Sequence, residues 1–211
     1  MNNSMIYSCC CKRICRGCSY ANYLREKEQG LEQKCPYCRE ELPATKEDEV
    51  HQNYMKRAKA NDPDALLEMG LFRYHKGDYD GAVEYLAKGT ELGDLVARYQ
   101  LGVMYETGQG VEKDEEKAVH HYEMAAIGGH PRARFNLGCI EEGNSRADRA
   151  VKHWIISAKL GETDSMEALW DHYKHGNIPK DDLEATLRTH QAAIDAMKSP
   201  QRDAAAAARR E

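Results

Sequence analysis

A short pattern of small and apolar residues recurs from residue 62 onward at intervals of 32 and 36 residues. The segment "ALLEMG" at residues 65–70 returns as "ARYQLG" at 97–102 and as "ARFNLG" at 133–138, and a degenerate copy, "SMEALW", follows at 165–170. A fixed period of this length is typical of repeat architectures, in which each unit buries its apolar side against its neighbours. We therefore expect a mainly α fold, an open α-solenoid of helix-turn-helix repeats.

Two motifs fill each period of the repeat. The second motif begins at Gly81, Lys117 and Arg149, where the sequence reads "GAVEYLAKG", "KAVHHYEMA" and "RAVKHWIIS". It keeps the same 36- and 32-residue spacing, and glycine-containing turn segments separate it from the first motif. Two apolar motifs with a turn between them predict two short helices in each unit.

Three of the four first motifs end in glycine, at Gly70, Gly102 and Gly138. Glycine inside a helix costs about 1 kcal/mol relative to alanine, so its recurrence in one register needs a physical reason. The reason we expect is a close crossing of two helices at each glycine. Larger side chains are expected to fill the seams beside these crossings, namely Leu66, Leu101, Leu137, Tyr85, Tyr122 and Trp154.

The repeats predict a division of the chain into a small N-terminal module and a larger helical part. The module spans residues 1–44, and a connecting helix capped by Thr45 spans residues 45–61. Residues 197–211 are expected to form a fraying helical tail, to which we assign no function. Between them we expect four units, at 62–93, 94–129, 130–161 and 162–196.

Seven of the eight cysteines lie within residues 9–38, and this clustering is the strongest chemical signal in the chain. Two thiolates three positions apart on a tight turn can both face one ion about 2.3 Å away, and two such pairs complete the tetrahedron that zinc prefers. The sequence therefore predicts a zinc site. Its first-choice ligands are the two C-x-x-C pairs, Cys15 with Cys18 and Cys35 with Cys38. Cys9 and Cys10 are the second-choice ligands, and Cys11 is the last choice.

The segment between the two pairs, residues 19–34, reads as a short helix that Ser19 opens and Gly30 interrupts. Four thiolates around one zinc ion leave a net charge near −2. Basic side chains close by in the sequence would offset this charge, namely Lys12, Arg13, Arg16, Lys34 and Arg39.

Two other uses of the cysteines stay open at this point, lasting disulfides and a redox-active C-x-x-C pair. The start of the chain lacks an apolar core of signal-peptide length, and no run approaches the roughly 18 apolar residues that cross a bilayer. We therefore expect an intracellular protein, cytoplasmic or nuclear and not secreted. In that compartment clustered cysteines more often bind metal than form disulfides.

The distribution of charge argues against nucleic acid as a partner. The formal net charge is −5, and residues 1–45 carry a small basic excess, so the rest of the chain is more acidic still. An acidic body does not follow a phosphate backbone. We expect neither nucleic-acid nor membrane partners.

The cysteine segment "YSCC-x-K-x-IC-x-GC … CP-x-CR" resembles the later part of a RING-type zinc finger, in the degenerate form found ahead of Sel-one-like repeats. In a RING finger eight ligands hold two zinc ions in a cross-brace. The resemblance implies that Cys15 and Cys18 serve one ion, and that Cys35 and Cys38 serve the other with Cys10 and a neighbour. The sequence departs from the pattern in three ways: residues 1–8 contain no C-x-x-C pair, Lys12 stands where histidine is usual, and Cys11 replaces a glycine.

The repeats, in turn, resemble the Sel-one-like repeat, a relative of the tetratricopeptide repeat. The second unit matches its pattern almost completely, at Ala97, Leu101, Gly102, Tyr105, Gly108, Gly110, Val111, Asp114, Lys117 and Ala118. The resemblance extends over roughly residues 62–196. It implies a binding surface for other proteins, as in scaffolds and adaptors.

Together the two resemblances suggest a zinc-containing scaffold or adaptor protein. The alternative is a RING-type ubiquitin ligase whose repeats recruit the substrate. Arg39 follows the last predicted ligand, at the position where active RING fingers place a basic residue that contacts the conjugating enzyme and its ubiquitin. We find no intrinsic active site, and we expect no ligase activity from this chain.

Other chemically capable residues are interpreted as structural. We expect solvated surface positions for six histidines on the helices, His120, His121, His153, His172, His175 and His190. Cys139 follows Gly138 and is expected to be a small core residue. The glycines at 108 and 110 read as a turn rather than as a nucleotide-binding loop.

Overall fold

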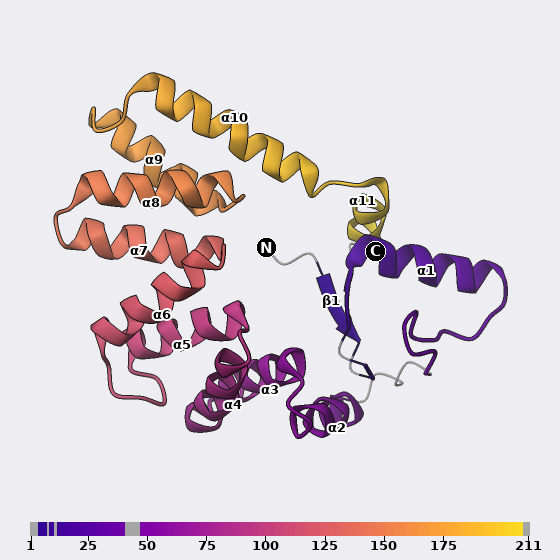
Figure 1. Cartoon of the computed structure of the whole chain (residues 1–211). Helices are drawn as coiled ribbons and strands as arrows, with labels where there is room; N and C mark the ends of the chain where they lie inside the picture. The colour runs from indigo at the N-terminus through magenta and orange to yellow at the C-terminus, as the bar shows by residue number, and fades with distance from the viewer. Residues whose placement is uncertain (1–3, 8, 11, 41–46, 209–211) are drawn as a thin grey trace. The chain divides into compact units, whose positions relative to one another are not determined.

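The structure is a computed structural model, and it describes residues 4–7, 9–10, 12–40 and 47–208 (Figure 1). The chain forms two compact units. Unit 1 comprises Met1–Leu92 together with Lys198–Glu211, and unit 2 comprises Gly93–Met197. Both units are mainly helical. Within the described ranges, no helix is both long enough and apolar enough to span a membrane.

Unit 1 begins with a two-stranded antiparallel hairpin. Strand β1 (Ser4–Tyr7) pairs with β2 (Lys12–Cys15), with Tyr7 opposite Lys12. The connection between the strands carries Cys9 and Cys10. Helix α1 (Arg16–Glu28) follows β2 without a linker.

The first helix begins three residues earlier than the sequence suggests. Cys15, and not Ser19, is its N-cap, and the Cys15 thiol accepts a hydrogen bond of 3.2 Å from the Cys18 amide. The Ser19 hydroxyl instead hydrogen-bonds the Tyr7 hydroxyl at 2.9 Å. A serine can cap a helix only where the backbone leaves helical geometry, and here that change occurs at the end of β2. Beyond the helix, Gly30 adopts a φ of 62°, consistent with its expected role as a helix stop.

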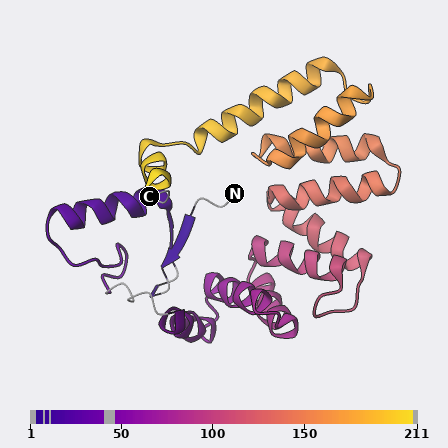
Figure 2. The ribbon, with the colours of Figure 1, turned by 180° about the vertical axis from the view of Figure 1, so that it is seen from behind.

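The C-terminal segment of the chain is part of unit 1. Helix α11 (Pro200–Ala207) packs against α1, as both ribbon views show (Figures 1 and 2). A Cβ atom on Gly17 would lie 2.6 Å from the backbone nitrogen of Arg202, so only glycine permits this approach. Instead of fraying as expected, the tail docks, because Gly17 leaves space for a second backbone.

The rest of unit 1 consists of helices α2 (Glu47–Ala58), α3 (Pro63–His75) and α4 (Tyr79–Glu91). Helix α2 packs on α3, and α3 on α4. A small core of Ala58, Ala65, Leu66 and Met69 holds α2 and α3 together. The predicted connecting helix thus corresponds to α2, whereas its proposed cap, Thr45, lies outside the described residues.

Unit 2 contains six consecutive helices that pack as neighbours in order along the chain, apart from α10. They are α5 (Leu95–Thr107), α6 (Glu115–Ile127), α7 (Pro131–Gly143), α8 (Ala147–Lys159), α9 (Thr163–Lys174) and α10 (Lys180–Ala196). Their apolar faces meet in two clusters, one around Tyr122 and one around Trp154.

The repeated glycines lie where two helices cross, as the sequence predicts. A Cβ atom on Gly102 would lie 2.6 Å from a ring carbon of Tyr122, and one on Gly138 would collide with the Trp154 indole. Tyr122 and Trp154 are 0% and 4% exposed, so each ring lies buried on its glycine. In unit 1 the residue facing Gly70 is Leu86 and not Tyr85; its Cγ would lie 2.7 Å from the added Cβ. Tyr85, the neighbour of Leu86, is partly buried and packs against the core that joins α2 and α3.

The fourth helix pair lacks the glycine and packs differently. Trp170 stands at the corresponding position, with 43% of its surface exposed. Helix α10 packs mainly on α8 instead of α9, and the His190 ring lies 2.8 Å from the Ala158 carbonyl oxygen. This pair therefore does not repeat the glycine crossing of the three preceding pairs.

The first helix of each matched pair also begins in the same way. Asp62 and Asp94 accept hydrogen bonds from the Ala65 and Ala97 amides, at 3.3 and 2.7 Å. In the next repeat His130 takes this position, and its Nδ1 accepts from the Ala133 amide at 3.2 Å. The conserved spacing of cap and motif alanine explains why each motif opens a helix.

The glycine crossing predicts a large effect of Gly102→Leu. Its side chain would enter the space of the Tyr122 ring, so we expect a loss of roughly 1–3 kcal/mol in unfolding free energy. The matched control is Gly143→Leu, since a Cβ atom at Gly143 meets nothing within 4 Å. Denaturant unfolding compares the two variants, and equal midpoints would show that Gly102 does not support a close crossing.

The His130 cap predicts acid sensitivity of unit 2. Partial burial lowers the pKa of His130 from 6.5 to about 4, because the half-buried ring is more stable in its neutral form. The unfolded chain therefore binds a proton that the folded chain does not bind. The free energy of unfolding consequently falls as the pH drops from about 6.5 to about 4. His130→Asn keeps a cap acceptor without titrating, so this variant should lose less stability between pH 7 and 5 in thermal unfolding. Identical pH profiles would contradict the assignment.

Candidate metal centre

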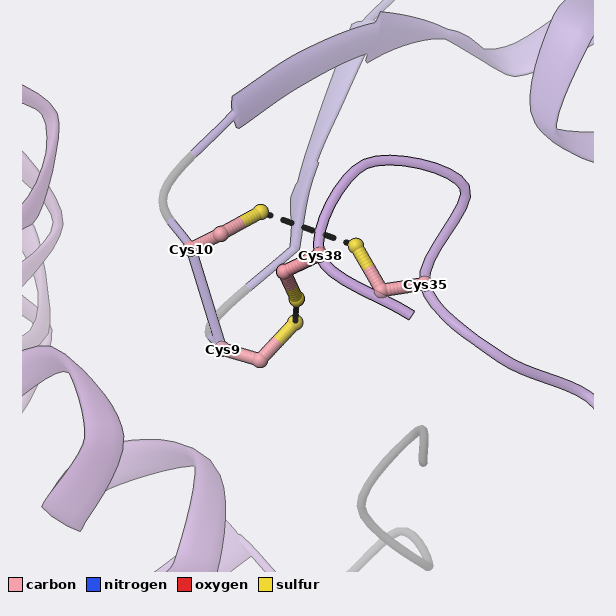
Figure 3. A group of neighbouring side chains, drawn as sticks. All are labelled: Cys9, Cys10, Cys35 and Cys38. Atoms are coloured by element: carbon pink, nitrogen blue, oxygen red, sulfur yellow. Dashed lines mark hydrogen bonds between the residues drawn. The ribbon is translucent and has the colours of Figure 1, made fainter. Parts of the chain in front are cut away.

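Four cysteine thiols meet in unit 1, and Figure 3 shows them pointing toward a common centre. The sulfur atoms of Cys9, Cys10, Cys35 and Cys38 all lie within 4.8 Å of one another. The Cys10 and Cys35 sulfurs are 3.5 Å apart, as are those of Cys9 and Cys38. A tetrahedron with metal–sulfur bonds of about 2.3 Å separates its sulfurs by about 3.8 Å. The four thiols thus have the size of a single tetrahedral metal site.

Two separate turns supply these thiols. Cys9 and Cys10 lie between β1 and β2, where the Cys10 amide donates to the Tyr7 carbonyl at 3.3 Å. Cys35 and Cys38 lie on a loop after α1, closed by the Arg39 amide donating to the Cys35 carbonyl at 3.0 Å. Arg39 completes this turn with a φ of 61°, a left-handed conformation that reverses the chain after the second thiol. Each turn presents two sulfurs on one side.

The environment of Cys35 favours its anionic form. Burial opposes ionisation of this fully buried thiol, but the amides of Cys38 and Tyr37 donate to its sulfur and, with the neighbouring thiols, lower its pKa. The two thiols of the hairpin, those of Cys9 and Cys10, behave in the opposite way. Burial raises the pKa of Cys9 and of Cys10, and hydrogen bonds to the other cysteines raise it further. Four thiolates at this distance repel one another, so full ionisation requires a cation among them.

Cys15 and Cys18, the other C-x-x-C pair, lie outside this group. Cys15 caps α1 and Cys18 lies in its first turn, and their thiols interact with each other. Within the described part of the chain, neither belongs to a group of three or more possible ligands. The structure therefore does not close the two C-x-x-C pairs on one ion. It brings the second pair together with Cys9 and Cys10.

The remaining candidate residues lie at the surface, in the helix packing or outside the described residues. Arg39 is exposed beside the four-thiol group, and Cys11 lies outside the described residues. Cys139 is exposed rather than a core residue. Two of the histidines expected at the surface are buried: His172 (9% exposed) packs on the Trp154 ring, and His190 is 8% exposed. Periodicity did not reveal their burial, because histidine is compatible with either face of a helix.

Arg202 is a neighbour of this region that the sequence did not indicate. Its guanidinium lies beside Cys15 and, after the Cys18 thiol and amide, lowers the pKa of the Cys15 thiol. The hydrogen bond to Cys15 raises the pKa of Cys18, which is exposed. No sequence motif near Cys15 or Arg202 predicts this contact, since α11 comes from the far end of the chain.

These features define a helical-repeat protein of the tetratricopeptide type with a cysteine cluster near its N-terminus. The family model of the Sel1 repeat matches residues 63–94, 95–130 and 131–162, so these segments are Sel1 repeats. They coincide with the helix pairs α3–α4, α5–α6 and α7–α8. The match does not extend to α9 and α10, and the assignment of residues 162–196 as a fourth unit stays a prediction.

The chain is similar to several known proteins over its repeats. An F-box protein of Arabidopsis thaliana is 27% identical over 97 residues, which cover 46% of this chain and only 27% of that protein. A Sel1 repeat protein from Oxalobacter formigenes has a TM-score of 0.63 at 24% identity, covering 82% of this chain and 71% of the other. A protective antigen of uropathogenic Escherichia coli with an SLR fold has a TM-score of 0.58 at 28% identity, covering 70% of this chain and 33% of the other.

Proposed function

We propose that this protein is a zinc-containing adaptor that binds partner proteins through its Sel1 repeats. The observation that carries the proposal is the presence of three Sel1 repeats, whose helix pairs present long rows of side chains to solvent. Repeat proteins of this kind commonly act by displaying such surfaces. The zinc module would then provide a folded end to the chain rather than a catalytic centre.

The composition of the N-terminal module supports a structural metal. In the described part of residues 4–40, the buried hydrophobic side chains are those of Tyr7 and Cys35. A core of this size cannot stabilise a fold of about forty residues, and small domains commonly compensate with metal ions or disulfides. Four thiolates are soft ligands that select zinc over harder cations such as magnesium and calcium. Zinc would therefore hold the hairpin against the loop that follows α1.

One part of unit 2 is suited to partner binding. A groove of about 420 Å³ lies where α5, α6 and α7 meet, lined among others by Glu106, Lys113, Glu115 and Cys139. Charged and polar side chains make up most of its lining, and the partly buried Ile140 adds an apolar side chain. Mixed polar and apolar surfaces are common in protein interfaces. We place the partner's contact in this groove.

The zinc proposal predicts metal loss on Cys35→Ser. We expect the variant to retain one zinc ion fewer per chain than the parent and to lose ordered structure before residue 41, because binding and folding of such sites are coupled. Elemental analysis and limited proteolysis measure the two effects. Cys139→Ser is the matched control, since that thiol is exposed on α7. A parent protein that contains no zinc when purified under reducing conditions would refute the proposal.

Crosslinking tests the interaction surface. A photoreactive phenylalanine analogue placed at position 139, inside the groove, should crosslink to a discrete partner in cells. The same analogue at position 152, an exposed site on α8 away from the groove lining, should not. Lys113→Glu should reduce the crosslink at 139 at least several-fold, because it reverses the charge of an exposed side chain of the groove lining. Equal crosslinking at the two positions would contradict this assignment of the surface.

Ubiquitin transfer distinguishes the alternative function. If the protein were a ligase, autoubiquitination with a panel of conjugating enzymes would depend on Arg39, and Arg39→Ala would abolish it while zinc is retained. For an adaptor we expect no Arg39-dependent chain formation.

A further inference from the structure

A second groove of unit 2 lies where α6, α7 and α8 meet, and we call it the α6–α8 groove. Its volume is about 640 Å³. It shares Glu115, Ile140 and Asn144 with the groove proposed above for partner contact, so the two adjoin. Helix α6 belongs to one Sel1 repeat, and α7 and α8 belong to the next. The α6–α8 groove therefore depends on the packing of two consecutive repeats.

The side chains that line the α6–α8 groove carry a negative net charge. Five acidic and two basic side chains contribute to the lining, which leaves a net charge of −3. His153, which also lines the groove, adds no positive charge at neutral pH, because burial and the nearby Arg134 lower its pKa. The acidic residues are Asp114, Glu115, Glu116, Glu123 and Glu141, and the basic residues are Arg146 and Arg149.

The two arginines are paired within the protein. Arg146 Nε lies 2.6 Å from one oxygen of the Glu141 carboxylate, and Arg149 Nη2 lies 3.1 Å from the other. Glu141 is only 9% exposed, so its carboxylate is enclosed by these two guanidinium groups. Much of the positive charge of the groove is thus bound to a buried anion of the same chain.

The glutamates of α6 differ from Glu141 in this respect. Glu115, Glu116 and Glu123 are exposed, and the printed sequence places all three on α6. Among the described residues, the ion pairs of this region join Lys117 to Asp114 and the two arginines to Glu141, and do not include these three glutamates. The helix dipole explains acidic residues in the first turn, but Glu123 lies in the second half of α6.

Apolar side chains accompany these charges. Val119 of α6 and Ile140 of α7 line the groove, and both are only partly buried. Lysine and arginine combine an aliphatic stem with a cationic end, so the stem can cover such residues while the end reaches a carboxylate. An acidic ligand would instead be repelled by the exposed glutamates.

We propose that the α6–α8 groove binds a lysine- and arginine-rich segment of a partner protein. The inference rests on the proposed adaptor function and specifies the chemistry of the partner. Charge complementarity with the three exposed glutamates selects the basic segment, and the apolar side chains between the charges accommodate its long stems.

Fluorescence anisotropy of a labelled octalysine peptide, titrated with the full-length protein, tests this inference. We expect saturable binding that weakens as the salt concentration rises, because salt screens the attraction between exposed charges. Glu123→Lys should weaken binding at least fivefold, since it replaces an attraction with a repulsion. The matched control is Glu167→Lys, which changes the net charge equally from an exposed position on α9 outside the groove lining and should leave the affinity unchanged.

Three outcomes would overturn the inference. They are a failure of octalysine to bind, equal weakening by Glu123→Lys and Glu167→Lys, and tighter binding of an octaglutamate peptide than of octalysine. Equal weakening would mean that the peptide responds only to the net charge of the chain.

The titration is separate from the crosslinking at position 139, which detects contact of any partner with the adjoining groove. A crosslink that persists without octalysine binding would refute only the basic segment. Octalysine binding that depends on Glu123, without a crosslink at position 139, would refute only the contact proposed for the adjoining groove.

Discussion

The helix pairs of this protein depend on one recurring contact, in which a large side chain of one helix lies on a glycine of the other. Leu86 covers Gly70, Tyr122 covers Gly102 and Trp154 covers Gly138. The absence of a Cβ atom lets the two helix axes approach, and the bulk of the second residue fills the space that remains. Each glycine lowers helix propensity locally, and the buried area of its partner offsets that loss. Trp170 stands at the corresponding position of the next pair, where α10 packs mainly on α8.

The N-terminal part of unit 1 is held together by other contacts than the helix pairs. It buries few apolar side chains, and its segments meet instead at the four thiols of Cys9, Cys10, Cys35 and Cys38. Hydrogen bonds from backbone amides and neighbouring thiols lower the pKa of Cys35 despite its burial. Burial instead raises the pKa of Cys9, so without a cation this thiol stays protonated. Helix α11 adds a contact at Gly17 and places a guanidinium next to Cys15. Glycine residues thus allow two helices to approach closely in both parts of the chain.

The repeats could be predicted from the sequence because the patterns that define them are local. A period of 32 or 36 residues, an alanine three positions after a capping residue and a glycine five positions after that alanine are each visible in single segments. The errors were local too. The seam residues named from the sequence include Tyr85 but not its neighbour Leu86, which covers Gly70, because only the crossing geometry shows which of the two faces the glycine. Ser19 resembled a cap, but the strand before α1 ends at Cys15, and the cap must lie where extended backbone becomes helical.

Local pattern alone determined the helical class, the repeat length, the glycine crossings and the cysteine-rich start of this protein. Which thiols face one another was decided by the hairpin, because C-x-x-C spacing specifies how two thiols share a turn and says nothing about which other turn lies opposite. The contact between Arg202 and Cys15 likewise depends on a helix from the end of the chain resting on Gly17. Contacts of this kind join residues far apart in sequence through backbone shape, and no residue pattern near either partner encodes them.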